Sequence, residues 1–129
     1  MSIVLNLEVS EDITVESLVK VLKSIEGCEI DWENGKVSAY FSRSNASVVI
    51  DDKLDDKCVI TDNMEGHDWS VGVRVYFDVD VTRPNALCDI RRYVVELSRI
   101  TKFPFVLSFQ YEKVYAINGS NGLVFKREF

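Results

Sequence analysis

Several stretches of the chain alternate between apolar and polar residues, which is the pattern of a β-strand with one buried face. Every second residue is apolar in 3–9 and in 71–79, and most residues between them are polar or charged. The stretch 105–111 alternates in the same way, and shorter apolar runs follow at 114–117 and 123–126. We therefore expect a strand in each of these segments.

Two further alternating stretches, 28–33 and 36–41, are separated only by the dipeptide Asn-Gly. This dipeptide supplies the two positive φ angles of a type I′ turn, so the pattern predicts a β-hairpin. The turn fixes the register and places Cys28 opposite Phe41. One face of the hairpin is then apolar and includes Trp32, while the other face is mostly charged.

Apolar residues recur at helical spacing in 15–25 and in 87–100, which predicts two amphipathic helices. We expect Asp12 or Thr14 to cap the first helix. Pro84 is expected in the first turn of the second helix, where a proline is tolerated. Each helix has its apolar residues on one side, so each should cover one face of a sheet.

The predicted elements give the order β-α-β-β, then two short strands at 47–50 and 58–60, then β-α-β-β again. This order is typical of an α+β domain, in which two helices pack on a mainly antiparallel sheet. A length of 129 residues fits a single α+β domain over 1–129, and no linker divides it. Whether the halves form a repeat is left open, since the pattern recurs but the residues do not.

The composition is that of an ordinary globular protein, with 47% apolar and 28% charged residues. The N-terminus lacks the basic n-region of a signal peptide, and no apolar run is long enough to span a membrane. Cys28, Cys58 and Cys88 are too far apart for a CxxC pair. We expect three reduced thiols that pack as small hydrophobic side chains, in a cytoplasmic protein that has no membrane partner.

Candidate catalytic residues are few. His67 is the one histidine, and its neighbour Asp68 could orient it as a general base. Adjacent strand residues point to opposite faces, however, and His67 lies in a polar bend, so we expect a solvated histidine. No nucleophile motif is present, and the sequence predicts no enzyme. A small enzyme built on paired carboxylates stays an alternative, because such pairs leave no sequence signature.

Metal and phosphate sites are not indicated either. The acidic loop at 51–57 could offer oxygen ligands, but it lacks the glycine and glutamate spacing of an EF-hand. Lys53 and Lys57 within this loop would repel a cation. The glycines fall at turns and form no phosphate-binding motif. We expect no metal and no cofactor.

Charge is distributed unevenly along the chain. Residues 1–80 contain 17 acids and seven bases, whereas residues 81–129 contain four acids and eight bases. The segment 51–68 alone has seven acids and two lysines. A cluster of this density can steer a basic partner, and Leu54, Met64 and Trp69, which lie in or beside it, suit an interface. A solvated loop that serves solubility is the simpler interpretation.

The candidate partner-binding residues are the acids of this segment and the apolar residues beside them: Asp51, Asp52, Leu54, Asp55, Asp56, Asp62, Glu65, Asp68 and Trp69. The opposite arrangement is also open, in which an acidic partner contacts the arginines of the second helix: Arg83, Arg91, Arg92 and Arg99. A net charge of −6 argues against direct nucleic-acid binding, since that binding depends on basic residues that neutralise phosphates.

A family resemblance lies in the small, acidic α+β architecture of the chain and in three segments near its C-terminus: 105–112, 114–117 and 121–123. In these features the chain resembles immunity proteins of bacterial contact-dependent growth inhibition and related polymorphic toxin systems. The resemblance covers the overall architecture and about the last quarter of the chain. It implies an inhibitor without catalytic activity that binds one cognate toxin domain, commonly a nuclease, and blocks its active site or substrate groove.

Another function class fits the same order of elements. Two β-α-β units side by side also suit a small-molecule-binding regulatory domain of ferredoxin-like type. The sequence leaves the oligomeric state open.

Overall fold

The computed structural model describes residues 2–61 and 68–128 of the chain. Its elements, in chain order, are β1 (Ser2–Ser10), α1 (Val15–Ser24), β2 (Cys28–Glu33), β3 (Lys36–Phe41), β4 (Ala46–Asp51), β5 (Val71–Asp80), α2 (Cys88–Ile100), β6 (Phe105–Phe109), β7 (Lys113–Gly119) and β8 (Gly122–Phe125). Within the described residues, neither helix is long and apolar enough to cross a membrane.

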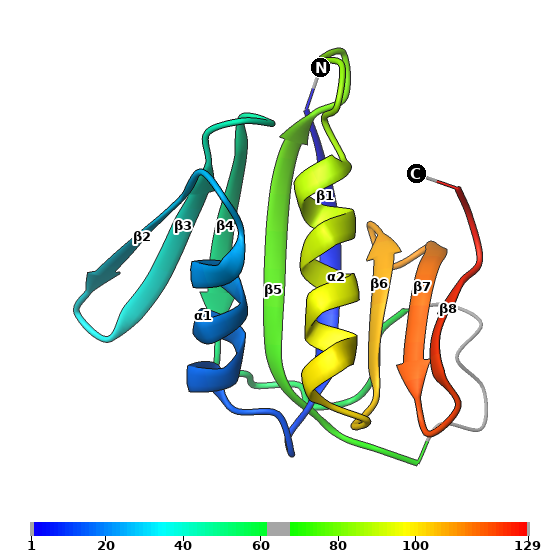
Figure 1. The fold of residues 1–129 in the computed structure, drawn as a ribbon. Coiled ribbons are helices and arrows are strands. Elements are labelled where there is room, and N and C mark those ends of the chain that lie inside the picture. The colour runs from blue at the N-terminus through cyan, green and yellow to red at the C-terminus, as the bar shows by residue number, and fades with distance from the viewer. Residues whose placement is uncertain (1, 62–67, 129) are drawn as a thin grey trace.

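The strands form one eight-stranded sheet in the order β2-β3-β4-β5-β1-β6-β7-β8. Every neighbouring pair in this sheet is antiparallel. Both helices lie on the same face of the sheet, with α1 in front of the β3–β5 side and α2 in front of β1 (Figure 1). The predicted α+β class, with two helices on an antiparallel sheet, is confirmed.

The centre of the sheet contains two interlocked split β-α-β units. In the first unit, β1 and β4 lie on either side of β5, and α1 lies between β1 and β4 in the chain. In the second unit, β5 and β6 lie on either side of β1, and α2 connects β5 to β6. This is the split arrangement of ferredoxin-like domains. Two hairpins extend this centre in different ways. In the first half the chain runs from the edge strand β2 inward to β4, whereas in the second half it runs from β6 outward to β8.

The core lies between the helices and the sheet face that they cover. Phe77 on β5 is at its centre, and its ring is 6.4 Å from that of Phe41 and 5.8 Å from that of Tyr93 on α2. The hydroxyl of Tyr93 donates to the carbonyl of Leu18 on α1 at 2.9 Å, which satisfies a polar group inside the core. Complete burial raises the pKa of Tyr93 well above its usual range.

The local predictions for the hairpin and the first helix are confirmed. Cys28 pairs with Phe41 in an unbroken register, and Asn34 and Gly35 have φ angles of 53° and 78°. Thr14, one of the two expected caps, accepts a hydrogen bond from the amide of Ser17 at 3.1 Å. Local turn and cap chemistry therefore specified these elements correctly.

Two expectations about segments are wrong. The run 58–60 is not a strand, because side chains take up its backbone groups; the amide of Ile60, for example, donates to the carboxylate of Glu8. Pro84 lies in a turn and not in the second helix, which begins only at Cys88. The φ of 66° at Asn85 between them is incompatible with a right-handed helix.

The expectation about the cysteines is also wrong in part. Cys28 is half-buried, whereas Cys58 and Cys88 are exposed. Cys58 lies in the segment that forms no strand, and Cys88 is on the first turn of α2, on its solvent side. Of the three thiols, only that of Cys28 packs against the core.

Candidate functional site

The sheet face that the helices leave uncovered, here called the outer face, carries many of the acidic side chains of the chain. Directly paired residues of antiparallel strands lie on the same face. Glu29 pairs with Tyr40, Tyr40 with Ser47 and Ser47 with Asp78, so this row crosses from β2 to β5. Strands are about 4.8 Å apart, which places the backbones at the two ends of the row about 14 Å from each other.

A second row and a third row run parallel to the first. Asp31 on β2 is linked through β3 and β4 to Tyr76 on β5, and Asp51 on β4 pairs with Arg74 on β5. Glu33 at the tip of the hairpin pairs with Lys36. The outer face of β2–β5 therefore combines exposed carboxylates with tyrosines on a rigid hydrogen-bonded sheet.

A buried ion pair occupies the middle of the outer face. Glu8 on β1 and Arg74 on β5 are paired in the sheet register, and their side chains are 0% and 5% exposed. The guanidinium Nη2 lies 3.2 Å from the carboxylate Oε2. Such a pair is costly to bury unless further hydrogen bonds satisfy it, and the segment 52–61 supplies them.

This segment, here called the strap, leaves β4 and runs behind the sheet past β5 and β1 toward β6 (Figure 1). Arg74 donates to two strap carbonyls, those of Asp56 and Cys58, each at 2.7 Å. In return Glu8 accepts from the amides of Ile60 and Thr61 at 2.9 and 3.0 Å. The hydroxyl of Thr61 also donates to Glu8. The ion pair therefore fixes the acidic strap on the outer face.

Of the nine residues expected to bind a partner, the five between Asp51 and Asp56 lie on the strap or at the end of β4, and Asp68 and Trp69 lie just before β5. Asp52, Asp55, Asp56 and Asp68 are exposed, and Asp51, Leu54 and Trp69 are half-buried. Asp62 and Glu65 lie outside the described residues, as does His67. The structure thus brings the described acids of 51–56 to the same side of the sheet as those of β2 and β5.

Two of the strap acids also shape the chain. Asp51 Oδ1 accepts from the amide of Lys53 at 3.1 Å, and Asp56 Oδ1 accepts from the amide of Cys58 at 2.9 Å. These contacts are Asx turns, in which the side chain replaces a backbone acceptor. The exposed Asp52 and Asp55 between them carry charge without any such contact among the described residues.

Several acids of the outer face were missed when the sequence was considered alone: Glu29, Asp31, Glu33 and Asp78. Their strands were predicted, and so was the polar character of their faces. What the sequence lacked was the strand order, which makes β2 and β5 parts of one surface with the strap.

The opposite side of the molecule is basic. Arg91, Arg92 and Arg99 are exposed on α2 and line a groove of about 630 Å³ beside Ser24 of α1. Arg99 is paired with Glu96 at 2.6 Å. The four arginines proposed for an acidic partner are thus on one side except Arg83, which lies in the turn before α2.

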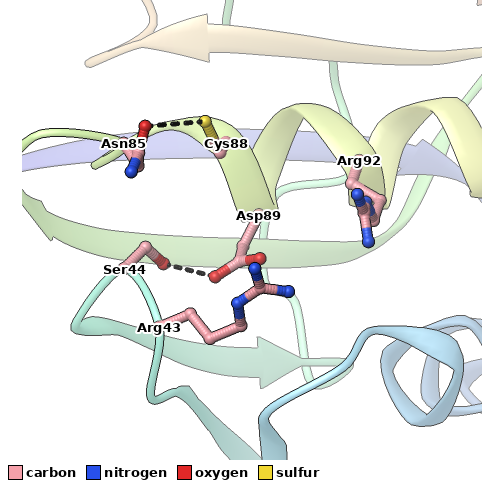
Figure 2. Close-up of a pocket in the computed structure, with 6 residues that line it drawn as sticks. All are labelled: Arg43, Ser44, Asn85, Cys88, Asp89 and Arg92. Atoms are coloured by element: carbon pink, nitrogen blue, oxygen red, sulfur yellow. Dashed lines mark hydrogen bonds between the residues drawn. The ribbon is translucent and has the colours of Figure 1, made fainter.

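A smaller pocket of about 290 Å³ adjoins this groove at the start of α2, and Figure 2 shows the residues that line it. Asp89 lies at its floor, is 7% exposed and accepts a hydrogen bond from Ser44 at 2.7 Å. The Arg43 side chain reaches toward this carboxylate, and Arg92 lies further along α2. Asp89 faces the positive end of the helix dipole and ties the β3–β4 turn to α2.

Burial perturbs a tyrosine and a cysteine near these surfaces. Burial, and then a hydrogen bond with Tyr76, raise the pKa of Tyr111 above its usual range on the outer face. Burial, together with the charges of Asp89 and Glu29, raises the pKa of Cys28 to about 11. Both groups are therefore protonated near neutral pH, and the Cys28 thiol is a poor nucleophile there.

In the part of the chain that the structure describes, no three His, Cys, Asp or Glu residues gather as a metal site. The described structure presents two contrasting surfaces, an acidic outer face and a basic helix side. Comparisons of the chain with protein-family models, with curated proteins and with solved structures find no match.

Proposed function

We propose that this protein is an immunity protein that binds a cognate toxin domain, a nuclease, and neutralises it without catalysis by covering its active site or substrate groove. The observation that carries the proposal is the gathering of carboxylates from β2, β4, β5 and the strap on one rigid face. A nuclease grips phosphates with basic residues. A fixed array of carboxylates can occupy the same basic groove through charge-assisted hydrogen bonds.

The rigidity of the strap supports this proposal. Glu8 and Arg74 hold the backbone of the strap at both strands of the central pair, so this backbone does not have to be ordered when a partner arrives. Preorganised contacts lose less conformational entropy on binding. The cytoplasm, where a toxin would meet its target, is the proposed location.

The opposite charges of the two sides of the molecule also support an acidic contact surface. The helix side presents Arg91, Arg92 and Arg99, while the outer face presents acids. A partner with a basic groove is attracted to one side and repelled by the other, which orients the encounter. Association should therefore be fast at low salt and slow as salt rises.

The proposed function predicts a neighbouring gene for a large secreted protein with a toxic C-terminal domain, and the test uses that domain. Asp51, Asp52, Asp55 and Asp56 are changed together to Asn, which keeps the side-chain oxygens that form the Asx turns and removes only the charge. The matched control changes Arg91, Arg92 and Arg99 to Gln on the opposite side. We expect the association rate constant of the Asn variant to fall by about tenfold or more, and we expect this variant to protect cells less well.

Three outcomes separate the possibilities. Loss of binding in the Asn variant alone supports the outer face. Loss in the Gln variant alone moves the contact to the helix side. No binding by the unmodified protein to a neighbouring toxin domain contradicts the proposed function itself.

A second candidate function is favoured by the groove beside α2. Its three arginines and the ferredoxin-like centre suit a regulatory domain that binds an anionic small molecule. Pyrophosphate as a probe should then raise the melting temperature of the wild type, and the Gln variant should show no shift.

A further inference from the structure

β2 is an edge strand whose outward side is open in the described part of the structure. It is the outermost strand of the sheet and pairs with β3 over six residues without a bulge. Proteins usually blunt an exposed edge with charged side chains, a proline, a bulge or a covering segment, and the charged residues of β2 are all acidic, which leaves its edge open to a basic strand. The sequence 28–33 contains neither proline nor lysine, and the hairpin projects beyond the helices (Figure 1).

The backbone of β2 offers hydrogen-bonding groups along this edge. The amide of Cys28 donates away from β3, to the carbonyl of Ile25 at 3.2 Å. Alternate residues of a strand direct their amides to the same side. The amides of Ile30 and Trp32 therefore also point away from β3, toward the open edge.

The side chains of β2 divide into two kinds. On the outer face, all three are acidic: Glu29, Asp31 and Glu33. On the helix side, Ile30 is half-buried, and Trp32 is 56% exposed. An incoming strand would meet carboxylates on one face and an apolar surface with an aromatic anchor on the other.

A second copy of the chain is a poor occupant of this edge. Any register of two β2 strands that keeps their faces aligned sets carboxylate against carboxylate, because every outer-face residue of β2 is acidic. Like charges directly opposite destabilise a strand pair. A register shifted by one residue would instead set carboxylates against Ile30 and Trp32. The charges thus select against pairing of two β2 strands and in favour of a basic strand.

We infer that the β2 edge binds an extended segment of a partner protein in which Lys or Arg residues alternate with apolar residues. The segment adds one strand to the sheet beside β2, with its basic residues over the outer face and its apolar residues against Trp32 and Ile30. Backbone hydrogen bonds supply affinity and the alternation supplies specificity. This inference rests on the proposed function, for which it names the kind of segment that the toxin domain presents.

The test begins with peptides, so that it does not depend on the toxin. The full chain, labelled with ¹⁵N, is titrated with the peptide Thr-Lys-Val-Lys-Val-Lys-Thr at millimolar concentration. A control peptide has the same residues with the lysines grouped together, and a second replaces each lysine by glutamate. We expect the alternating basic peptide to shift the amide resonances of β2, and both controls to leave them unchanged.

Two variants at one position then separate edge pairing from simple charge attraction. Ile30→Pro removes an amide that points to the open edge and keeps the amides that face β3, a position where an edge strand tolerates proline. Ile30→Ala also removes most of the isoleucine side chain but keeps the backbone amide. We expect Ile30→Pro, relative to Ile30→Ala, to bind the basic peptide about tenfold more weakly or not at all, while dispersed β3 resonances show that the hairpin stays folded in both.

Equal binding of the two lysine peptides, equal binding by the two variants, or no shift of β2 resonances would each overturn the inference. The toxin domain gives the second arm. If the toxin domain binds Ile30→Ala and Ile30→Pro with equal affinity, the β2 edge is excluded as its contact surface, and the proposed function is unaffected. Peptide binding at β2 together with no toxin binding supports the edge and contradicts the proposed function.

Discussion

The buried pair between Glu8 and Arg74 should be the most sensitive point of the structure, and Arg74→Met is the sharpest way to test it. Methionine replaces the aliphatic part of the arginine side chain, but it has no guanidinium and donates no hydrogen bond. The substitution removes a cation from beside a carboxylate that is completely buried. It also removes the donors to the carbonyls of Asp56 and Cys58, each bound at 2.7 Å.

The magnitude follows from these contacts. Removing one partner of a buried ion pair costs about 3–5 kcal/mol, because the remaining charge is left without compensation. The total stability of a domain of this size is about 5–15 kcal/mol, so Arg74→Met removes a large share of it. Adding Glu8→Gln takes away the stranded charge and keeps one side-chain oxygen, so one of the two strap amides that bind the separate carboxylate oxygens keeps its acceptor. The double variant should therefore recover about 1–3 kcal/mol relative to Arg74→Met alone.

Urea unfolding followed by tryptophan fluorescence and by circular dichroism measures both free energies. With a slope of about 2 kcal/mol per molar urea, the midpoint of Arg74→Met should fall by about 2 M. Trypsin cleavage at Lys53 and Lys57 under native conditions gives a local readout, since the strap loses its ties and should be cut faster. Lys53→Met is the control for an exposed cation and should change stability by less than about 0.5 kcal/mol.

Two results would refute this reasoning. One is a cost below about 1 kcal/mol for Arg74→Met, which would mean that the pair is not isolated from water. The other is a double variant no more stable than Arg74→Met, which would mean that the stranded charge of Glu8 is not the cause of the loss.

Three further predictions concern other parts of the fold. Gly72→Ala should cost about 1–3 kcal/mol in urea unfolding, because the added Cβ would lie 2.5 Å from the Cα of Glu11, whereas Gly119→Ala meets nothing within 4 Å and should be near neutral; equal effects would contradict the close approach. Thr14→Ala should cost about 1 kcal/mol through the lost helix cap, and a stability equal to wild type would show that the cap contributes nothing. At pH 8 the two exposed cysteines should react with a thiol reagent much faster than Cys28, whose pKa is raised from 9.0 to about 11 by burial and nearby carboxylates. The folded state holds the Cys28 proton more tightly than the unfolded state does. The contribution of this thiol to the free energy of unfolding is therefore complete below pH 9 and is lost as the pH rises through 11. Cys28→Ser should flatten this alkaline decline in stability.

The local elements of this protein could be predicted from its sequence because their causes lie within a few residues. The Asn34-Gly35 turn fixes the hairpin register through the φ angles that only such a pair adopts easily. The cap at Thr14 and the helical spacing of apolar residues place α1 in the same way. The uneven distribution of charge along the chain also needed no structure.

Tertiary structure alone decided how these elements form surfaces. Glu8 and Arg74 look like ordinary polar strand residues, and only the path of the strap buries them. The run 58–60 has the composition of a strand but lies against side chains that take its hydrogen bonds. Backbone groups go to whichever partner is in reach, and reach depends on segments that are far apart in the sequence.

The candidate site was therefore predicted in part. The acids of 51–56 were found from their density in the sequence, but the acids of β2 and Asp78 join them only because β4 pairs with β5 and the β2–β3 hairpin adds to β4. Alternation determines which face of a strand is polar, since it follows from backbone geometry. Which strands share that face depends on the packing of two helices and eight strands around one core, which no short stretch of sequence contains.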